Sequence, residues 1–197
     1  MASELPVVQG GFKTIYADPP WAEIGAGRIR RGADRHYALM KTEDIVRLPV
    51  RMIKSQEGCH LYLWATSNFL RDALRVMEAW GFDYKGHIVW VKGEETEGGE
   101  ITLDVIGLGQ YIRYVHELLL FGVYKVLPYR IRADGRRAQW KSVLIEPRRE
   151  HSQKPLKAYQ YIEEVSWPPY LEMFARSRYD INWTVWGLEA PVEGSVA

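Results

Sequence analysis

Short segments rich in β-branched and aromatic residues alternate along this chain with segments of helical spacing, and this alternation constrains the fold most. Strands are expected at residues 12–17, 59–65, 84–91, 116–121, 170–175 and 183–186. Strands that alternate with helices form a largely parallel sheet covered on both faces, so the sequence predicts an α/β fold. No internal repeat, linker or low-complexity tract interrupts residues 1–197, and we expect a single domain.

Three helices are expected between these strands. The first is capped by Thr42 and limited by Pro49, the second starts at Ser67 or Asn68 and ends at Gly81, and the third has Pro155 at its first position. Their expected buried faces include Leu70, Leu74 and Met77 in the second helix, and Leu156, Tyr159, Ile162 and Val165 in the third. Residues 22–37 are expected to form a loop, and residues 125–153 an irregular basic segment.

The composition is that of an ordinary globular protein, with 47% hydrophobic and 26% charged residues, which excludes a chain that is disordered throughout. Cys59 is the single cysteine and is expected in the core, so no internal disulfide can form. No Cys/His spacing is typical of a zinc site, and we expect no metal. Without a signal-peptide pattern or an apolar stretch of about 18 residues, the sequence predicts a cytoplasmic protein with no membrane contact.

Charge is distributed unevenly, although the formal net charge is only +1. Residues 28–36 contain four arginines, residues 125–154 have a local net charge of +6, and residues 94–104 are acidic. Phosphate backbones attract such local basic patches whatever the total charge, so we predict contacts with nucleic acid, with solvated loops as the alternative. The expected nucleic-acid-binding residues are Arg28, Arg30, Arg31, Arg35, Tyr37, Arg136 and Arg137.

The tetrapeptide Asp18, Pro19, Pro20 and Trp21 directly follows the first expected strand. The prolines fix φ and lack N–H donors, so the turn presents one carboxylate, free carbonyl oxygens and one large aromatic face. These groups suit a planar substrate with an exocyclic amino group, because the oxygens accept both N–H bonds and aim the nitrogen lone pair at an electrophile. The alternative is a strand-terminating turn with a buried tryptophan. The other tryptophans at positions 64, 80 and 90 are expected in the core.

This tetrapeptide resembles the catalytic D-P-P-[WF] motif of the MT-A70-like family, adenine N6-methyltransferases that use S-adenosylmethionine. Further segments similar to the family follow in family order at residues 61–66 (LYLWAT), 88–92 (IVWVK), 116–122 (HELLLFG), 151–155 (HSQKP), 171–176 (LEMFAR) and 186–189 (WGLE). The resemblance extends from residue 12 to residue 189. It implies a Rossmann-like methyltransferase fold with a mostly parallel, twisted sheet, helices on both faces and a circularly permuted motif order.

The resemblance also implies roles for individual residues. Asp18 would face both the methionine amino group of the cofactor and the target amine, Lys154 would bind the cofactor carboxylate, and Glu172 with Arg176 would hold the ribose hydroxyls. Leu188 stands where the family usually has an asparagine near the ribose. The implied cofactor-binding residues are Asp18, Lys154, Glu172, Phe174, Arg176 and Glu189. On the residues alone, a surface helix start at Lys154 and a strand-end ion pair of Glu172 with Arg176 are alternatives.

The expected activity is metal-free, in-line transfer of a methyl group from S-adenosylmethionine to adenine N6 in nucleic acid. DNA is favoured over RNA because small stand-alone members of the family are commonly bacterial or phage proteins. Residues 22–37 are expected to close over a flipped or unpaired base. An RNA adenine N6-methyltransferase and a non-catalytic nucleic-acid-binding subunit are the alternatives, and the family also implies a homodimer or a heteromeric partner.

Overall fold

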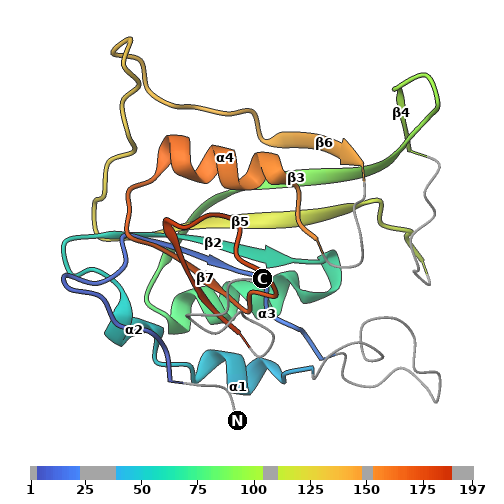
Figure 1. The fold of residues 1–197 in the computed structure, drawn as a ribbon. Helices are drawn as coiled ribbons and strands as arrows, with labels where there is room; N and C mark the ends of the chain where they lie inside the picture. The colour runs from blue at the N-terminus through green and yellow to red at the C-terminus, as the bar shows by residue number, and fades with distance from the viewer. Residues whose placement is uncertain (1–3, 23–38, 104–110, 148–152, 188–197) are drawn as a thin grey trace.

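The computed structural model describes residues 4–22, 39–103, 111–147 and 153–187 of the chain (Figure 1). Its sheet has the strand order β4-β3-β5-β2-β1-β7-β8, and β6 pairs with β3 beside this path. The strands are β1 (Thr14–Ala17), β2 (Cys59–Ala65), β3 (Asp83–Glu95), β4 (Ile101–Thr102), β5 (His116–Tyr124), β6 (Val143–Pro147), β7 (Tyr170–Met173) and β8 (Trp183–Trp186). The helices are α1 (Thr42–Val46), α2 (Val50–Ile53), the 3₁₀ turn η2 (Ser67–Phe69), α3 (Leu70–Ala79) and α4 (Leu156–Val165).

The sheet is mixed and mostly parallel. Strand β1 pairs in parallel with β2 and β7, β7 with β8, and β3 with β6. Strand β5 is antiparallel to both β2 and β3, and the short β4 is antiparallel to β3. Six of the eight described strands therefore run in one direction, and their carboxyl ends lie along one edge.

Helices cover both faces of this sheet, as Figure 1 shows. Along β1, Ile15 packs in the cluster that includes residues of α1 and α3, while Tyr16 packs in the cluster that includes Ala158 and Ile162 of α4. This alternation is the period-2 pattern of a strand buried on both faces. The predicted α/β Rossmann-like architecture is therefore confirmed.

The predicted core residues are buried, but two helix faces differ from the prediction. The three tryptophans at positions 64, 80 and 90 and the free Cys59 are all buried. Leu74 is 38% exposed, because the buried side of α3 consists of Ala73, Val76 and Met77. Leu156 is 39% exposed for the same kind of reason, since Ala158, Ile162 and Val165 form the buried side of α4.

Helix ends are displaced by one residue from their predicted positions. Lys41 occupies the N-cap position of α1, so Thr42 is the first helical residue and not the cap. Pro155 occupies the N-cap position of α4 and not the first helical position. Gly81 ends α3 as predicted, with a φ of +80° that favours glycine.

Strand β6 lies within the segment that the sequence analysis predicts to be irregular. Among the described strands it pairs with β3 alone, and its outward-facing Val143 and Ile145 are exposed. A short run whose apolar residues are not all buried lacks the clear alternation of an inner strand. Among the described residues, no helix is long and apolar enough to span a bilayer.

Candidate active site

Parallel pairing brings the ends of β1, β2 and β7 to the same edge of the sheet. Ala17 at the end of β1 is in register with Leu63 of β2 and with Met173 of β7. Asp18 is the next residue, and its backbone N–H donates to the carbonyl of Met173 at 3.4 Å. The carboxyl edge of an α/β sheet is where ligands generally bind, so Asp18 begins the candidate site.

The turn after Asp18 is held by one internal hydrogen bond, by hydrogen bonds to two other segments and by a ring stack. The Pro19 carbonyl accepts from Trp21 N–H at 2.9 Å, and the Pro20 carbonyl accepts from Met40 N–H at 2.7 Å. The Trp21 indole N–H donates to the Trp64 carbonyl at 3.2 Å, and its ring stacks on Phe69 with centroids 5.6 Å apart. Each prolyl carbonyl keeps a second lone pair, and the indole has a fixed orientation.

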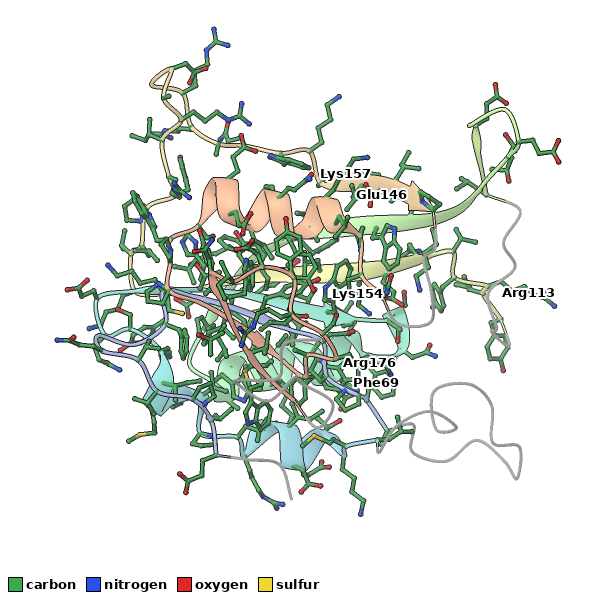
Figure 2. All side chains as sticks on the ribbon, in the orientation of Figure 1. Phe69, Arg113, Glu146, Lys154, Lys157 and Arg176 are labelled. Atoms are coloured by element: carbon green, nitrogen blue, oxygen red, sulfur yellow. The ribbon has the colours of Figure 1, made fainter. Side chains whose placement is uncertain are left out.

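The Asp18 carboxylate belongs to a row of four side chains with alternating charges. Lys154 Nζ lies 2.9 Å from Asp18 Oδ2 and 3.2 Å from Glu117 Oε2. The other Glu117 oxygen accepts from Lys92 Nζ. The Asp18 side chain is 30% exposed, whereas the other three are more deeply buried. Figure 2 shows Lys154 at the edge of the sheet where the parallel strands end.

Burial and the neighbouring charges shift the pKa values within this row. Burial raises the pKa of Asp18, and the Glu117 charge adds to this, although Lys154 opposes the shift. Burial alone would also raise the pKa of Glu117, but Lys154 and Lys92 outweigh it and lower the value to about 2. Burial would lower the pKa of Lys154, but Asp18 and Glu117 raise it above its usual value. Glu117 and Lys154 therefore stay charged near neutral pH, and Asp18 is the better proton acceptor of the two carboxylates.

Glu172 in β7 has one satisfied and one unsatisfied carboxylate oxygen. Its side chain is buried, and Oε1 accepts from the Tyr159 hydroxyl of α4 at 2.8 Å. Within the described part of the chain, Oε2 has no hydrogen-bond partner. Burial, with the Asp18 charge, raises the pKa of Glu172 to about 7. Since a buried polar atom without a partner is costly, Oε2 is suited to accept a hydrogen bond from a ligand hydroxyl.

The segments after β7 and β8 cross closely beside Glu172. Phe174 has a φ of +66°, and its ring packs edge-on against Trp186 with centroids 5.4 Å apart. A Cβ on Gly187 would lie 2.4 Å from the Ala175 carbonyl oxygen, so only glycine permits this crossing. Arg176 follows at the surface, and its charge lowers the pKa of Asp18. Figure 2 shows Arg176, Phe69 and Lys154 at the same end of the sheet.

Comparison with known proteins agrees with this geometry. A family model described as MT-A70 matches residues 12–189, and so covers most of the chain. The chain belongs to the MT-A70 family of S-adenosylmethionine-dependent adenine N6-methyltransferases.

Named relatives of this MT-A70 protein fall into two groups. The chain is 26% identical to the type II methyltransferase M.MunI of Mycoplasma sp, covering 91% of this chain and 78% of that protein. It is 25% identical to the N(6)-adenosine-methyltransferase subunit METTL3 of Danio rerio, covering 91% of this chain but 28% of that protein. A probable MT-A70-like N(6)-adenosine-methyltransferase of Oryza sativa subsp. japonica is 26% identical, over 86% of this chain and 21% of that protein. The chain thus spans about a quarter of these plant and animal relatives.

The residues at the MT-A70 site fit the cofactor of the family. Among the described residues, Lys154 uses two of its three N–H donors, on Asp18 and Glu117, so the third can donate to a cofactor carboxylate. The unpartnered Glu172 Oε2 suits a ribose hydroxyl. Glu189 and Leu188 lie outside the described residues. Among the residues that the structure describes, no group of three or more His, Cys, Asp or Glu side chains could hold a metal ion.

Of the predicted nucleic-acid-binding residues, the structure describes Arg136 and Arg137, and these two do not lie at this edge. Arg136 and Arg137 lie on a hairpin-like turn in the segment that packs against the carboxyl-terminal end of α4, whereas Lys154 precedes its amino-terminal end. The remaining predicted residues, Arg28, Arg30, Arg31, Arg35 and Tyr37, lie outside the described parts of the chain.

Sequence reasoning missed Glu117, Tyr159 and Phe69, which contact the predicted site residues Lys154, Glu172 and Trp21, respectively. It also missed Lys92, which contacts Glu117. Glu117 begins an otherwise apolar strand, and Lys92 follows the apolar residues 88–91 of β3. A charged residue beside an apolar run of a strand is a signal of a functional role. The partners of these two charges follow only from the antiparallel pairing of β3 with β5, which places Trp90 opposite Glu117. The sequence alone does not specify that pairing.

Proposed function

We propose that this MT-A70 protein transfers the methyl group of S-adenosylmethionine to the N6 amino group of adenine in nucleic acid, with DNA favoured over RNA. The observation that carries the proposal is the Asp18 carboxylate at the end of β1, in contact with Lys154 and beside the fixed Trp21 ring. DNA is favoured because the chain covers 78% of a relative named as a type II methyltransferase and at most 28% of the METTL3 and rice relatives described above.

Five side chains would hold the cofactor. Lys154 would donate to its carboxylate, Asp18 would accept from its amino group, and Glu172 with Arg176 would bind the ribose hydroxyls. Phe174 would line the site, and Glu189 stays a further candidate. When bound, S-adenosylmethionine supplies an electrophilic methyl group on a sulfonium ion. The positive charge of Lys154 is already balanced by two carboxylates, so it would orient the cofactor carboxylate without adding net charge.

The turn of residues 18–21 would hold the target base. The Asp18 carboxylate and the Pro19 carbonyl would each accept one N–H of the adenine amino group, while Pro20 keeps the turn rigid and Trp21 stacks on the ring. Transfer would form the bond from N6 to the methyl carbon while the bond from that carbon to the sulfonium sulfur breaks, so the sulfur would leave as a neutral thioether and N6 would carry an extra proton. Asp18 would accept this proton, a role that its raised pKa favours.

The test is methyl transfer from labelled S-adenosylmethionine to duplex DNA, single-stranded DNA and RNA of matched sequence. Asp18→Asn should lower the rate by at least about 100-fold, because the amide keeps the shape of the carboxylate but loses its charge and basicity. Activity retained by this variant would contradict the mechanism. Methyl transfer to RNA alone would show that RNA, and not DNA, is the substrate. Nucleic-acid binding without cofactor binding in calorimetry would support the non-catalytic alternative.

Three other expectations stay predictions. A single domain over residues 1–197 and a homodimer or a second subunit can be tested by limited proteolysis and by light scattering. The cytoplasmic location is the third prediction, and the free, buried Cys59 is compatible with it.

A further inference from the structure

We propose that residues 125–142, called here the basic arm, bind the phosphate backbone of the substrate at a distance from the target base. The preferred substrate then extends by about five base pairs or more on one flank of the target adenine. The inference rests on the proposed function, which supplies the position of the target base at Asp18.

The basic arm and the catalytic edge lie at opposite ends of α4. Arg130 N–H donates to the Val165 carbonyl at 2.8 Å, and the Arg130 guanidinium donates to the Glu163 carbonyl at 2.6 Å, both at the carboxyl-terminal end of the helix. Lys154 comes two residues before the other end. A helix of ten residues is about 15 Å long, so at least this distance separates the two sites. Figure 1 shows the arm as the segment that leaves β5 and passes α4 to reach β6.

Several contacts give the arm a defined structure. Arg132 forms an ion pair with Glu164 of α4, and the Trp140 indole N–H donates to the same carboxylate at 2.5 Å. Between these anchors, the Arg132 N–H donates to the Arg136 carbonyl at 2.8 Å, and Gly135 takes a φ of +77° to close the turn. Arg136 and Arg137 are thereby presented on an anchored turn, which reduces the conformational entropy lost on binding.

The charges that the arm presents to solvent are mainly positive. It contains six lysine or arginine residues and one acidic residue, Asp134. The Arg136 side chain is 83% exposed and lies 3.9 Å from the 54% exposed side chain of Asp134, an ion pair that contributes little in water. Within the described residues, Arg137 and Lys141 make no ion pair with a carboxylate, and the Arg137 guanidinium lies 5.4 Å from the centre of the Tyr129 ring. Such a patch fits a polyanion.

None of the exposed side chains of α4 is acidic. The exposed side chains of the helix are Leu156, Lys157 and Gln160. Glu164 is engaged by the arm, and Glu163 accepts from the Trp183 indole N–H at 2.8 Å. A nucleic-acid backbone can therefore pass along this helix without meeting exposed like charge.

The separation sets the length of nucleic acid that can use both sites. Phosphates recur every 3.4 Å along each strand of a duplex, so about 15 Å corresponds to four or five base pairs. Contacts to phosphates carry no sequence information, and the arm would therefore add affinity without adding sequence specificity. Only the flank that runs along α4 would contribute.

The experiment uses hairpin-closed DNA duplexes with one target adenine and two flank lengths. Two long duplexes have three base pairs on one side of the adenine and twelve on the other, in opposite orientations. The third, short duplex has three base pairs on each side. Arg136→Ala/Arg137→Ala should raise KM about tenfold for one orientation of the long duplex, less than twofold for the short duplex, and leave kcat unchanged. The plot of log Kd against log salt should become shallower by up to about 1.8, the value for two lost phosphate contacts.

A matched control removes two exposed arginines from the other face of the sheet. Arg47→Ala/Arg75→Ala has the same change in net charge and breaks only exposed ion pairs on α1 and α3, so it should change neither KM nor the salt slope. Equal losses for short and long duplexes, no loss for either long duplex, or equal effects of the two double variants would overturn the proposal. If the arm binds an acidic protein instead of nucleic acid, the arm variant should have no effect with any of the oligonucleotides.

Binding of the same fluorescent duplexes, measured by anisotropy, separates this proposal from the proposed function. If no methyl transfer is seen, the proposed function fails, but a length-dependent loss of binding in the arm variant still supports the arm. If methyl transfer is seen without length dependence, only the arm proposal fails.

Discussion

Asp18, in the turn after β1, and Glu117, in β5, share one lysine, and this arrangement distinguishes the roles of the two carboxylates. Glu117 is the more acidic, with a pKa lowered to about 2, whereas the pKa of Asp18 is raised. Because the Lys154 ammonium group forms ion pairs with both carboxylates, its positive charge is shared between them. We infer that Glu117 is a positioning residue that acts on Asp18 through Lys154.

Glu117→Gln tests this coupling. The Glu117 charge raises the pKa of Asp18, so its removal should lower that pKa. Since Asp18 accepts hydrogen bonds when ionised, activity falls as the pH drops through its pKa. The acid limb of the kcat profile should therefore move to lower pH in the variant, while kcat at its optimum falls by about tenfold. The measurement is the pH dependence of methyl transfer.

Glu43→Gln serves as the control, because Glu43 is an exposed carboxylate paired with Arg75 on the far side of the sheet. Its acid limb should coincide with that of the wild type. A loss of rate in Glu117→Gln with an unmoved acid limb would mean that Glu117 is only structural.

Glu172 makes stability depend on pH. Its pKa is about 7 in the folded protein against an ordinary value of 4.5, so its contribution is complete below pH 4.5 and is lost as the pH rises through 7. Glu172→Gln should remove this dependence, and the gain in free energy of unfolding relative to the wild type should be about 3 kcal/mol larger at pH 8 than at pH 4. Urea unfolding of both proteins at the two pH values measures the difference.

The comparison between the two proteins cancels the other titrating groups. An equal difference in unfolding free energy at both pH values would show that Glu172 ionises normally in the folded protein.

Among the elements, the crossing of the chain beyond β7 and β8 depends on one glycine. A Cβ at Gly187 would lie 2.4 Å from the Ala175 oxygen and 2.8 Å from its nitrogen, both backbone atoms that cannot swing away. Gly187→Ala should therefore lower the free energy of unfolding by about 1–3 kcal/mol. It should also weaken cofactor binding, because the displaced segment adjoins Glu172 and Phe174.

Gly98→Ala is the matched control. Its nearest atom outside its chain neighbours would be Thr96 Oγ1 at 3.8 Å, an ordinary contact, and its φ is not positive. Thermal unfolding should separate the two variants, and equal melting temperatures would contradict the steric argument.

At the scale of the whole molecule, the site joins strands from both ends of the chain. Asp18 follows β1, whereas Lys154, Glu172 and Phe174 come from α4 and β7 or their flanks. A cofactor held by both parts stabilises only the folded protein. S-adenosylmethionine at 100 times its Kd should therefore raise the free energy of unfolding by about 2.7 kcal/mol and Tm by roughly 5–10 °C.

Differential scanning fluorimetry with and without cofactor measures this shift. Lys154→Met should lose most of it, because the methionine fills a similar volume without an ammonium group. A full shift in that variant would mean that the cofactor is not held at Lys154.

The sequence predicted best those elements whose structure depends on residues that are adjacent in the chain. Strand β2 occupies residues 59–65 and β8 residues 183–186, as predicted, because both are short β-rich runs bounded by clear breaks. Strand β6 was missed since it pairs on one edge only and exposes Val143 and Ile145. The buried side of α3 was misplaced because a 3₁₀ turn precedes the helix at residues 67–69.

The sequence by itself determined the strand and helix order and the catalytic turn of residues 18–21, because local periodicity and two adjacent prolines restrict the backbone without help from distant segments. Only the tertiary structure decided that Glu117 and Lys92 adjoin Lys154, and that Arg136 and Arg137 lie at the far end of α4. These facts depend on the pairing of β5 with its neighbours and on the packing of the arm against α4. Contacts between residues far apart in the chain arise from packing, and the local pattern of a sequence does not specify them.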